Sequence, residues 1–425
     1  MLATVVVTFT ALLLLGLPIA GVMVGVTALA LRLHTFTPLL IIPQQLFNAL
    51  DNFVLLAIPF FILAGRIMTE GAMARRLVDV MRALVGTKRG GLAVTAVLAC
   101  LFFAALSGSS PATVVAIGSI MIPALVRSGY PEEFSVGLIT SAGSLGIVIP
   151  PSIPMILYAL VMNVSVAELF MAGIGPGLLI GGVFTAYVLW KARREDWRIE
   201  GGLTWAEALQ AVRHGIWALF LPVLVLGGIY SGVFTPTEAA AVSVVYALFV
   251  EAVVHRELTW KGLHRALVES AVLSGCLLLI LACAMAFVWL LTAEGLPATV
   301  AEWVVARVES PWAFLLWVNL LFLALGSVMD DVSAMLILSP IFAETLRRLG
   351  IDPVHYGIVM VLVIEFGFLT PPFGLNLFVA MGLTRKPMGY VARATLPFLA
   401  LLLLALAVVT YVPSVSLWLP SLFYR

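Results

Sequence analysis

The sequence contains unusually little charge. Asp, Glu, Lys and Arg make up 11% of its 425 residues, whereas about 25% is typical of soluble domains. Hydrophobic residues reach 62%, and the mean hydropathy is +1.14. This composition excludes an ordinary soluble domain and predicts a polytopic protein embedded in a lipid bilayer. The net charge of +1 provides no basic field that would attract nucleic acid.

Cysteine and histidine are also scarce, which limits the available chemistry. The three cysteines lie in apolar runs without a Cys-x-x-Cys pair, so no disulfide framework is expected. The five histidines form no His-Glu-x-x-His motif and no ligand cluster. An intramembrane enzyme would need a nucleophile with a base, or a metal set, and only His355 comes near a candidate segment. No glycine-rich run is followed by Lys-Ser or Lys-Thr, which argues against ATP-driven transport by this chain.

Long apolar runs fill most of the chain. A helix needs about 20 such residues to cross a bilayer. Continuous spans are predicted at about 3–31, 167–190, 215–231, 236–254, 268–293 and 391–417, with shorter ones near 37–50 and 53–65. The first 31 residues lack a basic start and indicate a span rather than a cleaved signal. The fold class is therefore all-α.

Four further apolar segments are interrupted. Segments 134–163 and 355–383 each contain a Pro-Pro pair that follows a glycine by four residues. A Pro-Pro pair breaks a helix, and freed backbone groups persist at membrane depth only in protein or beside a cavity. Segments 91–127 and 312–346 are divided by polar turns, and their short halves predict two re-entrant helical hairpins. Paired breaks of this kind point to the binding site of a transporter.

Basic loops orient the chain. Loops 66–90, 191–213, 255–266 and 384–393 are rich in Lys and Arg and are placed in the cytoplasm, whereas 294–310 is acidic and is placed outside. Arg347 and Arg348 are a minor exception. Each half then has an odd number of crossings, which predicts an inverted repeat: residues 1–190, a cytoplasmic linker at 191–214, and residues 215–425. The first hairpin enters from the cytoplasm and the second from outside. Loop 66–90 predicts an interfacial amphipathic helix, or else a plain connector.

The interruptions also carry the candidate cation ligands, because hydroxyls and freed carbonyls are hard oxygen donors. In the hairpin turns, an ionisable group at membrane depth adds a functional hypothesis. The predicted Na⁺ ligands are Ser107, Gly108, Ser109, Ser110, Gly146, Val148, Pro150, Gly326, Asp330, Asp331, Gly367, Leu369 and Thr370.

New helix N-termini after the breaks suit an anionic substrate, because their amides carry partial positive charge. The predicted substrate-binding residues are Ser110, Thr113, Pro151, Ser152, Ser333, Pro372, Gly374 and Asn376. Structural explanations remain open: ordinary turns with helix caps, an aspartate that only caps its helix, or Pro-Pro kinks without a site. Glu365 is either a coupling carboxylate or a structural partner of a neighbouring hydroxyl.

Several motifs carry a resemblance to a known family. They are Ile58–Gly65, Ser107–Ser110 with Ala112-Thr113, Gly129-Tyr130, Gly146–Ser152, Pro176-Gly177, Gly232–Ala240, Gly350–Pro353 and Thr370–Asn376. Together they resemble the large membrane subunit of tripartite ATP-independent periplasmic (TRAP) transporters, the DctM-like family, over essentially the whole chain. Pro111 departs from the pattern, since a small residue such as alanine is expected there, and it stiffens the turn.

The resemblance implies a Na⁺-driven elevator with no cofactor beyond the coupling ion. It implies two partners: a separate small four-helix membrane subunit, expected because the chain starts at its first span, and a periplasmic solute-binding protein that delivers a carboxylate substrate. The implied setting is a bacterial or archaeal inner membrane. Rival hypotheses are a stand-alone ion-coupled anion symporter without a binding protein, the intramembrane enzyme, and a passive channel that conducts without ion coupling.

Overall fold

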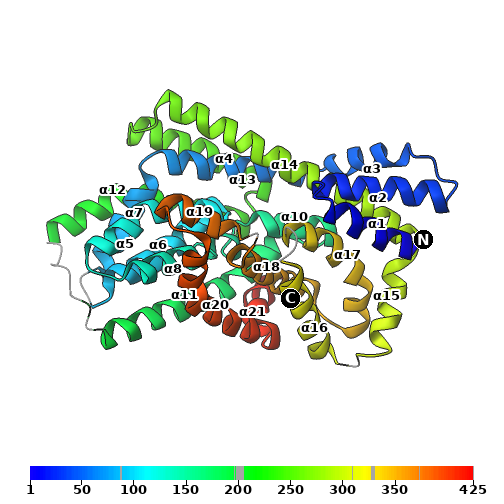
Figure 1. The fold of residues 1–425 in the computed structure, drawn as a ribbon. Coiled ribbons are helices and arrows are strands. Elements are labelled where there is room, and N and C mark those ends of the chain that lie inside the picture. Colours follow the sequence, from blue (N-terminus) through cyan, green and yellow to red (C-terminus); the bar gives the residue numbers. More distant parts are fainter. Residues whose placement is uncertain are drawn as a thin grey trace.

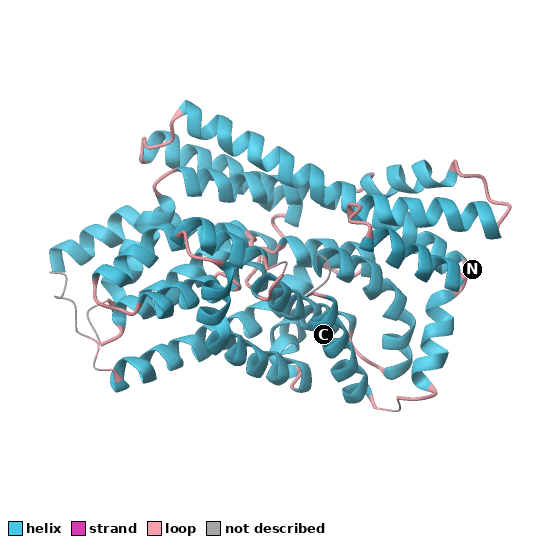
Figure 2. Cartoon of the chain, viewed as in Figure 1, coloured by secondary structure: helices cyan, strands magenta, loops and turns pink. Residues whose placement is uncertain are grey.

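The described residues form helices and connecting turns only. The computed structural model describes residues 1–86, 89–195, 197, 205–308, 310–326, 331–372 and 374–424, and within these ranges no strand occurs (Figures 1 and 2). Eight of the described helices are long and apolar enough to cross a membrane. The all-α, multi-pass class predicted from composition is therefore confirmed.

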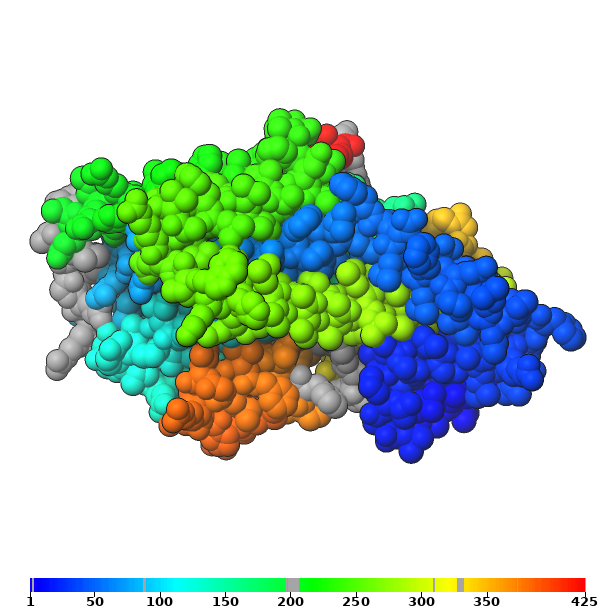
Figure 3. Space-filling view, turned by 90° about the horizontal axis from the view of Figure 1, so that it is seen from above, coloured from blue at the N-terminus to red at the C-terminus, as the bar shows by residue number. Residues whose placement is uncertain are grey.

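A layer of long helices forms one side of the molecule. It contains α4 (Ala57–Glu70), α13 (Pro236–Phe249) and the 34-residue α14 (Trp260–Ala293). α4 packs against both α13 and α14. Figure 3 shows α14 running across the face toward the N-terminal helices, and α14 contacts α2 (Ile19–His34) and α3 (Ile41–Leu50). We call α4, α13 and α14 the frame.

Two predicted spans are wrong as single helices. The segment 3–31 consists of α1 (Leu2–Leu14) and α2, because Gly16 adopts a φ of +76° and Pro18 starts a new helix. The segment 391–417 likewise divides at Pro413 into α20 (Met388–Tyr411) and α21 (Ser414–Phe423). In both cases a proline stops a run whose hydropathy is continuous.

Both predicted hairpins are pairs of packed helices. The first joins α6 (Gly91–Ser107) to α7 (Ser110–Arg127), and the second joins α16 (Pro311–Leu325) to α17 (Asp331–Leu349). Gly108 turns the first hairpin with a φ of +61°. Pro111 is the second residue of α7, where its missing N–H costs nothing. α7 has 18 residues, which is within the range of complete spans, so re-entrance stays a prediction.

The Pro-Pro segments are broken helices, as predicted. The first comprises α8 (Glu132–Ala142), the four-residue α9 (Leu145–Val148) and α10 (Ile153–Met162). The second comprises α18 (Pro353–Leu369) and α19 (Leu375–Thr384). Both Pro-Pro peptide bonds are cis.

The two halves interlock at these segments. α7 of the first hairpin packs against α19 of the second broken helix, and α10 of the first broken helix packs against α17 of the second hairpin. The closing helices α11 (Val166–Arg194) and α20 pack together beside them. This reciprocal exchange is what two equivalent halves would produce, while their inverted orientation stays a prediction.

The amphipathic helix predicted in loop 66–90 exists as α5 (Met73–Val85). Its apolar residues Met73, Leu77, Val80 and Met81 are buried. They face α6 and α12 (Trp205–Tyr230), both of which pack against α5. The helix was predicted correctly but its environment was not, because the apolar face covers neighbouring helices rather than lipid. The remaining elements are the short η1 (Phe53–Leu56), η2 (Val250–Val254) and α15 (Leu296–Val305).

Candidate functional site

The tip of the first hairpin lies directly against the first helix break. The N–H of Ile153 donates to the carbonyl oxygen of Gly108 at 3.3 Å. A Cβ on Gly146 would lie 2.5 Å from the carbonyl oxygen of Ser109 and 2.7 Å from the hydroxyl of Thr113. Only glycine permits this approach, which explains why a glycine precedes the Pro-Pro pair.

Hydroxyls gather at this contact. The Thr113 hydroxyl donates to the Ser109 carbonyl at 2.9 Å and lies 3.0 Å from the Ser107 hydroxyl. Ser107 and Thr113 are buried, and Ser109 is half-buried. The hydroxyls of Ser141 and Ser144, which shortly precede Gly146 in the sequence, are buried without a hydrogen-bond partner among the described residues. Such a set of oxygens has the chemistry of a small-cation site.

A buried polar triad connects the two halves. The Ser110 hydroxyl donates to Glu365 Oε1 at 3.2 Å, and Asn376 Nδ2 donates to the Ser110 hydroxyl at 2.7 Å and to Glu365 Oε1 at 3.2 Å. All three side chains are buried. Glu365 is thus the partner of a neighbouring hydroxyl, one of the two roles left open by its sequence. Its position inside an apolar segment was visible in the sequence, but its partner in the other half of the chain was not.

The second break is partly closed by its own backbone. The Thr370 N–H donates to the Gly367 carbonyl at 3.3 Å, and the Thr370 hydroxyl donates to the carbonyl of Phe366. The carbonyl oxygen of Gly367 therefore already accepts one hydrogen bond. In the first break, the carbonyl oxygen of Val148 lies against Gly173 of α11. The assignment of these carbonyls to a cation stays a prediction.

The second hairpin tip is described only in part. Gly326 ends α16, and Ser333 is buried in the first turns of α17. Asp330 lies outside the described residues, as does the side chain of Asp331. Both predicted ligands therefore stay predictions.

One cavity of about 350 Å³ joins these segments. It is lined by Ser107, Gly108 and Ser109 of the first tip, and by residues of both broken helices and of α17. The first turns of four helices border it: Ala112 in α7, Ile153 in α10, Val332 in α17 and Leu375 in α19. Ser152 caps α10, since its hydroxyl accepts from the Met155 N–H at 3.4 Å. The remaining wall comes from α4 and α14 of the frame.

Seven of the predicted residues lie at the cavity or contact the segments that line it. Ser107, Gly108 and Ser109 line the cavity. Thr113 and Gly146 contact these lining residues. Ser110 and Asn376 are hydrogen-bonded to each other and do not themselves line the cavity. Sequence reasoning missed Arg66 of α4, which lines the cavity. Its position in an apolar span was a signal, but it was counted as part of a cytoplasmic loop.

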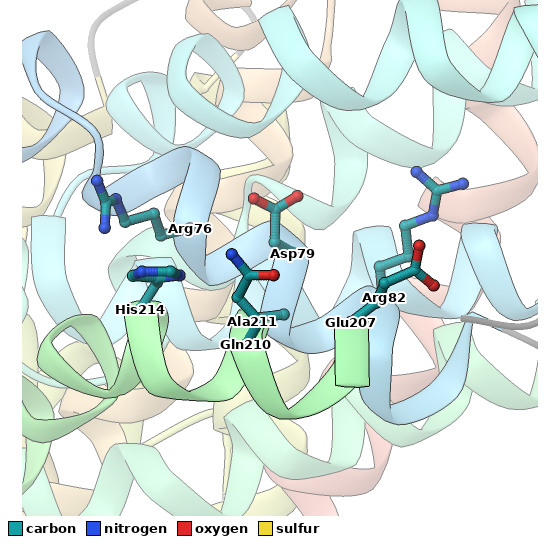
Figure 4. Close-up of a pocket in the computed structure, with 7 residues that line it drawn as sticks. All are labelled: Arg76, Asp79, Arg82, Glu207, Gln210, Ala211 and His214. Carbon is teal, nitrogen blue, oxygen red and sulfur yellow. The ribbon is translucent and has the colours of Figure 1, made fainter. Parts of the chain in front are cut away.

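A second cavity, of about 250 Å³, lies between α5 and α12 (Figure 4). Figure 4 shows Arg76 beside His214, Asp79 beside Gln210, and Arg82 beside Glu207. The lining thus carries both signs of charge and does not include a residue of either hairpin tip. The arrangement favours no particular ligand and is separate from the interrupted helices.

An all-helical membrane protein whose broken helices meet at one cavity has the architecture of a secondary transporter. The family model of the "Tripartite ATP-independent periplasmic transporter, DctM component" matches residues 6–415. The chain therefore belongs to the DctM family and is a TRAP transporter permease subunit, not an enzyme.

Named relatives agree with the family. The chain is 50% identical over 377 residues to the C4-dicarboxylate TRAP transporter large permease protein DctM of Pseudomonas aeruginosa, covering 89% of this chain and 88% of that protein. It is 45% identical over 428 residues to the protein of the same name from Rhodobacter capsulatus, covering 97% of each. A solved structure, the Alcanivorax borkumensis YdaH transporter, has the same fold, with a TM-score of 0.67 at 16% identity and coverage of 98% of this chain and 99% of that one.

Proposed function

We propose that this chain is the Na⁺-coupled import subunit for an organic anion, most simply a C4-dicarboxylate. One observation carries the proposal: interrupted helices from both halves of the chain border a single cavity. Such interruptions persist at membrane depth only where they are buried in protein or line a cavity, and in transporters the freed groups bind the ion and the substrate. The relatives named for C4-dicarboxylates supply the substrate class.

The anion part of the proposal rests on the helix termini. The first turns of α7, α10, α17 and α19 border the cavity. Each helix contributes partial positive charge at its N-terminus, and together these ends favour a carboxylate between the hairpin tips. Ser110, Thr113, Pro151, Ser152, Ser333, Pro372, Gly374 and Asn376 remain the proposed surroundings of the substrate.

The cation part rests on the hydroxyl cluster at the first tip. Ser107 and Thr113 contribute two hydroxyls and Ser109 one carbonyl oxygen, and these three oxygens lie 2.9 to 3.3 Å from one another. Na⁺ would replace some of these hydrogen bonds with oxygen ligands, and the second tip would supply the equivalent set. The coupling makes import depend on the Na⁺ gradient.

Movement and partners complete the proposal. Both hairpins and both broken helices would move together as an elevator against the frame. A small membrane subunit would bind the fixed part, and a periplasmic binding protein would deliver the substrate, as the tripartite family description requires. The setting is the inner membrane of a bacterium.

The experiment is uptake of radiolabelled succinate into proteoliposomes that contain this chain, its small subunit and its binding protein. Uptake is expected to need an inward Na⁺ gradient and the binding protein. Uptake that is indifferent to Na⁺ would contradict the coupling ion, and full uptake without the binding protein would favour the stand-alone symporter. Conductance without coupling would favour the channel.

Variants of the proposed cation ligands sharpen this test. Ser107→Ala, which removes one hydroxyl of the cluster, and Asp330→Ala are each expected to raise the Na⁺ concentration for half-maximal uptake about tenfold, because one lost oxygen ligand costs on the order of 1.4 kcal/mol. Ser119→Ala in α7 is the matched control, since its hydroxyl donates only to Ala116 within the helix. An unchanged Na⁺ dependence in both test variants would remove these assignments.

A further inference from the structure

Among the described residues that line the cavity at the first hairpin tip, Arg66 is the one that carries a charge. The other described lining residues are apolar or carry hydroxyls. Arg66 lies in the last two turns of α4, within a helix that is long and apolar enough to cross the membrane. An ionisable side chain in such a place usually faces a cavity or a partner and marks a substrate path.

The position of Arg66 follows from its neighbour. A Cβ on Gly65 would lie 3.1 Å from Cα of Ser107. The glycine therefore lets α4 touch the tip of the first hairpin, and Arg66 comes one residue later along the helix. Arg66 therefore contributes to the cavity wall from the frame, whereas the four helix N-termini contribute from the hairpins and broken helices.

Arg66 is held by a single acidic partner. Its Nη1 lies 3.0 Å from Glu269 Oε2 of α14, and the two side chains are 30% and 43% exposed. Ion pairs with this exposure contribute little to stability, about 0–1 kcal/mol. A bound carboxylate can therefore replace Glu269 at low cost, and Arg recognises a carboxylate with two parallel hydrogen bonds.

We propose that Arg66 binds the charged group of the substrate on the fixed side of the cavity, and that Glu269 holds its guanidinium when no anion is present. The inference rests on the proposed anion import. It adds that the frame carries part of the specificity: the mobile tips provide neutral hydroxyls and amides, whereas the frame provides the full positive charge. Dianions, which can occupy both sides at once, are selected over uncharged analogues.

A structural ion pair is the competing explanation. Arg66–Glu269 joins α4 to α14, and so does Arg265 with Glu70 at 3.5 Å. The charge-swapped double variant Arg66→Glu with Glu269→Arg separates the two ideas. It retains the bond between the helices but moves the positive charge to α14.

The first test measures charge in the cavity without any substrate. Ala112, which lines the cavity, is changed to cysteine in a Cys276→Ser background, because Cys276 is exposed whereas Cys100 and Cys283 are buried. Its modification rates with an anionic and a cationic methanethiosulfonate reagent are compared in the purified, intact chain. Arg66→Gln is expected to lower the anionic-to-cationic rate ratio about fivefold and Glu269→Gln to raise it about fivefold. Ratios that stay within the range of the Arg265→Gln control would overturn the proposal.

The second test uses succinate uptake in the complete transporter. Arg66→Gln is expected to raise KM about tenfold, Arg66→Lys less, and Arg265→Gln within twofold of the unmodified chain. The charge swap should remain as impaired as Arg66→Gln. Full recovery in the swap would identify a structural pair and overturn the proposal. If the unmodified chain does not transport succinate, the uptake experiment contradicts the proposed function. The modification rates still test the contribution of Arg66 to the charge in the cavity.

Discussion

At the scale of single residues, the Ser110–Glu365–Asn376 triad is the feature that holds the two halves in register. Three buried polar side chains from α7, α18 and α19 are joined by hydrogen bonds of 2.7 to 3.2 Å. Buried polar groups are costly when a partner is removed, because the remaining group has no water to replace it. The triad therefore fixes how the first hairpin meets the second broken helix.

Replacing Asn376 tests this role. Asn376→Leu removes two donated hydrogen bonds, one to Ser110 and one to the Glu365 carboxylate, so we expect a loss of about 2–3 kcal/mol in stability. We also expect a higher Na⁺ concentration for half-maximal uptake, because the first hairpin tip is no longer held in position against α19. Thermal unfolding in detergent and uptake at graded Na⁺ measure the two effects.

Asn319→Leu is the matched control. Asn319 is also buried and donates to Thr410 at 3.0 Å, but it joins α16 to α20 away from the triad. It should lower stability without moving the Na⁺ concentration for half-maximal uptake. Equal shifts in Na⁺ dependence for both variants would contradict a specific role of the triad.

At the scale of elements, the N-terminus of α5 is hydrogen-bonded to η2, which directly follows α13 of the frame. Glu251 of η2 is buried and accepts from the N–H groups of Ala72 and Met73 at 2.9 and 2.7 Å. Gly71 gives this carboxylate room, since a Cβ there would overlap it. His255 lies 3.2 Å from the same carboxylate, and burial lowers the pKa of His255 although Glu251 acts to raise it. A carboxylate at a helix N-terminus satisfies its free amides and its dipole.

Glu251→Ala is therefore expected to detach the N-terminus of α5 from η2. The loss of two charge-assisted hydrogen bonds should cost about 3 kcal/mol and expose Arg75 and Arg76 to trypsin. Cleavage rates of the intact chain in detergent, with thermal unfolding, are the measurements. Glu257→Gln is the control, because Glu257 pairs with Arg75 and Arg76 at the surface and should change stability by under about 1 kcal/mol. Identical protease resistance in Glu251→Ala and the unmodified chain would show that α5 is held by its apolar face alone.

At the scale of the whole molecule, the cavity is lined on one side by the frame and otherwise by the interlocked hairpins and broken helices. An elevator requires these two parts to move relative to each other, with the frame intact. Leu277 of α14 and Val115 of α7 both line the cavity, one from the frame and the other from the first hairpin. Cysteines at both positions, in a Cys276→Ser background and joined by a bifunctional thiol reagent, should stop uptake.

The control bridge lies within the frame. Cysteines in place of Glu70 and Arg265, an ion pair between α4 and α14, connect helices that do not separate in an elevator. This bridge should preserve at least about half of the uptake. Uptake that survives the bridge between Leu277→Cys and Val115→Cys would argue against relative movement of the two parts. Mass spectrometry of the bridged peptides verifies each cross-link.

Several features were predictable because they depend on local chemistry. The Pro-Pro pairs necessarily interrupt their helices, the turn at Gly108 necessarily divides α6 from α7, and Thr235 and Glu238 form the capping box at the start of α13. The paired breaks also indicated a common site. Hydropathy was less reliable at Gly16 and Pro413, because apolar residues continue through the turns.

What the sequence by itself determined is where helices stop, since proline and glycine act on their own backbone and need no distant partner. Only the tertiary structure decided which interruptions meet. The pairing of Ser110 with Asn376, 266 positions apart, depends on how α7 packs against α19. The placement of Arg66 in the cavity wall depends on the contact between Gly65 and Ser107. Such contacts arise from packing between helices, and the pattern of a single helix contains no information about its neighbour.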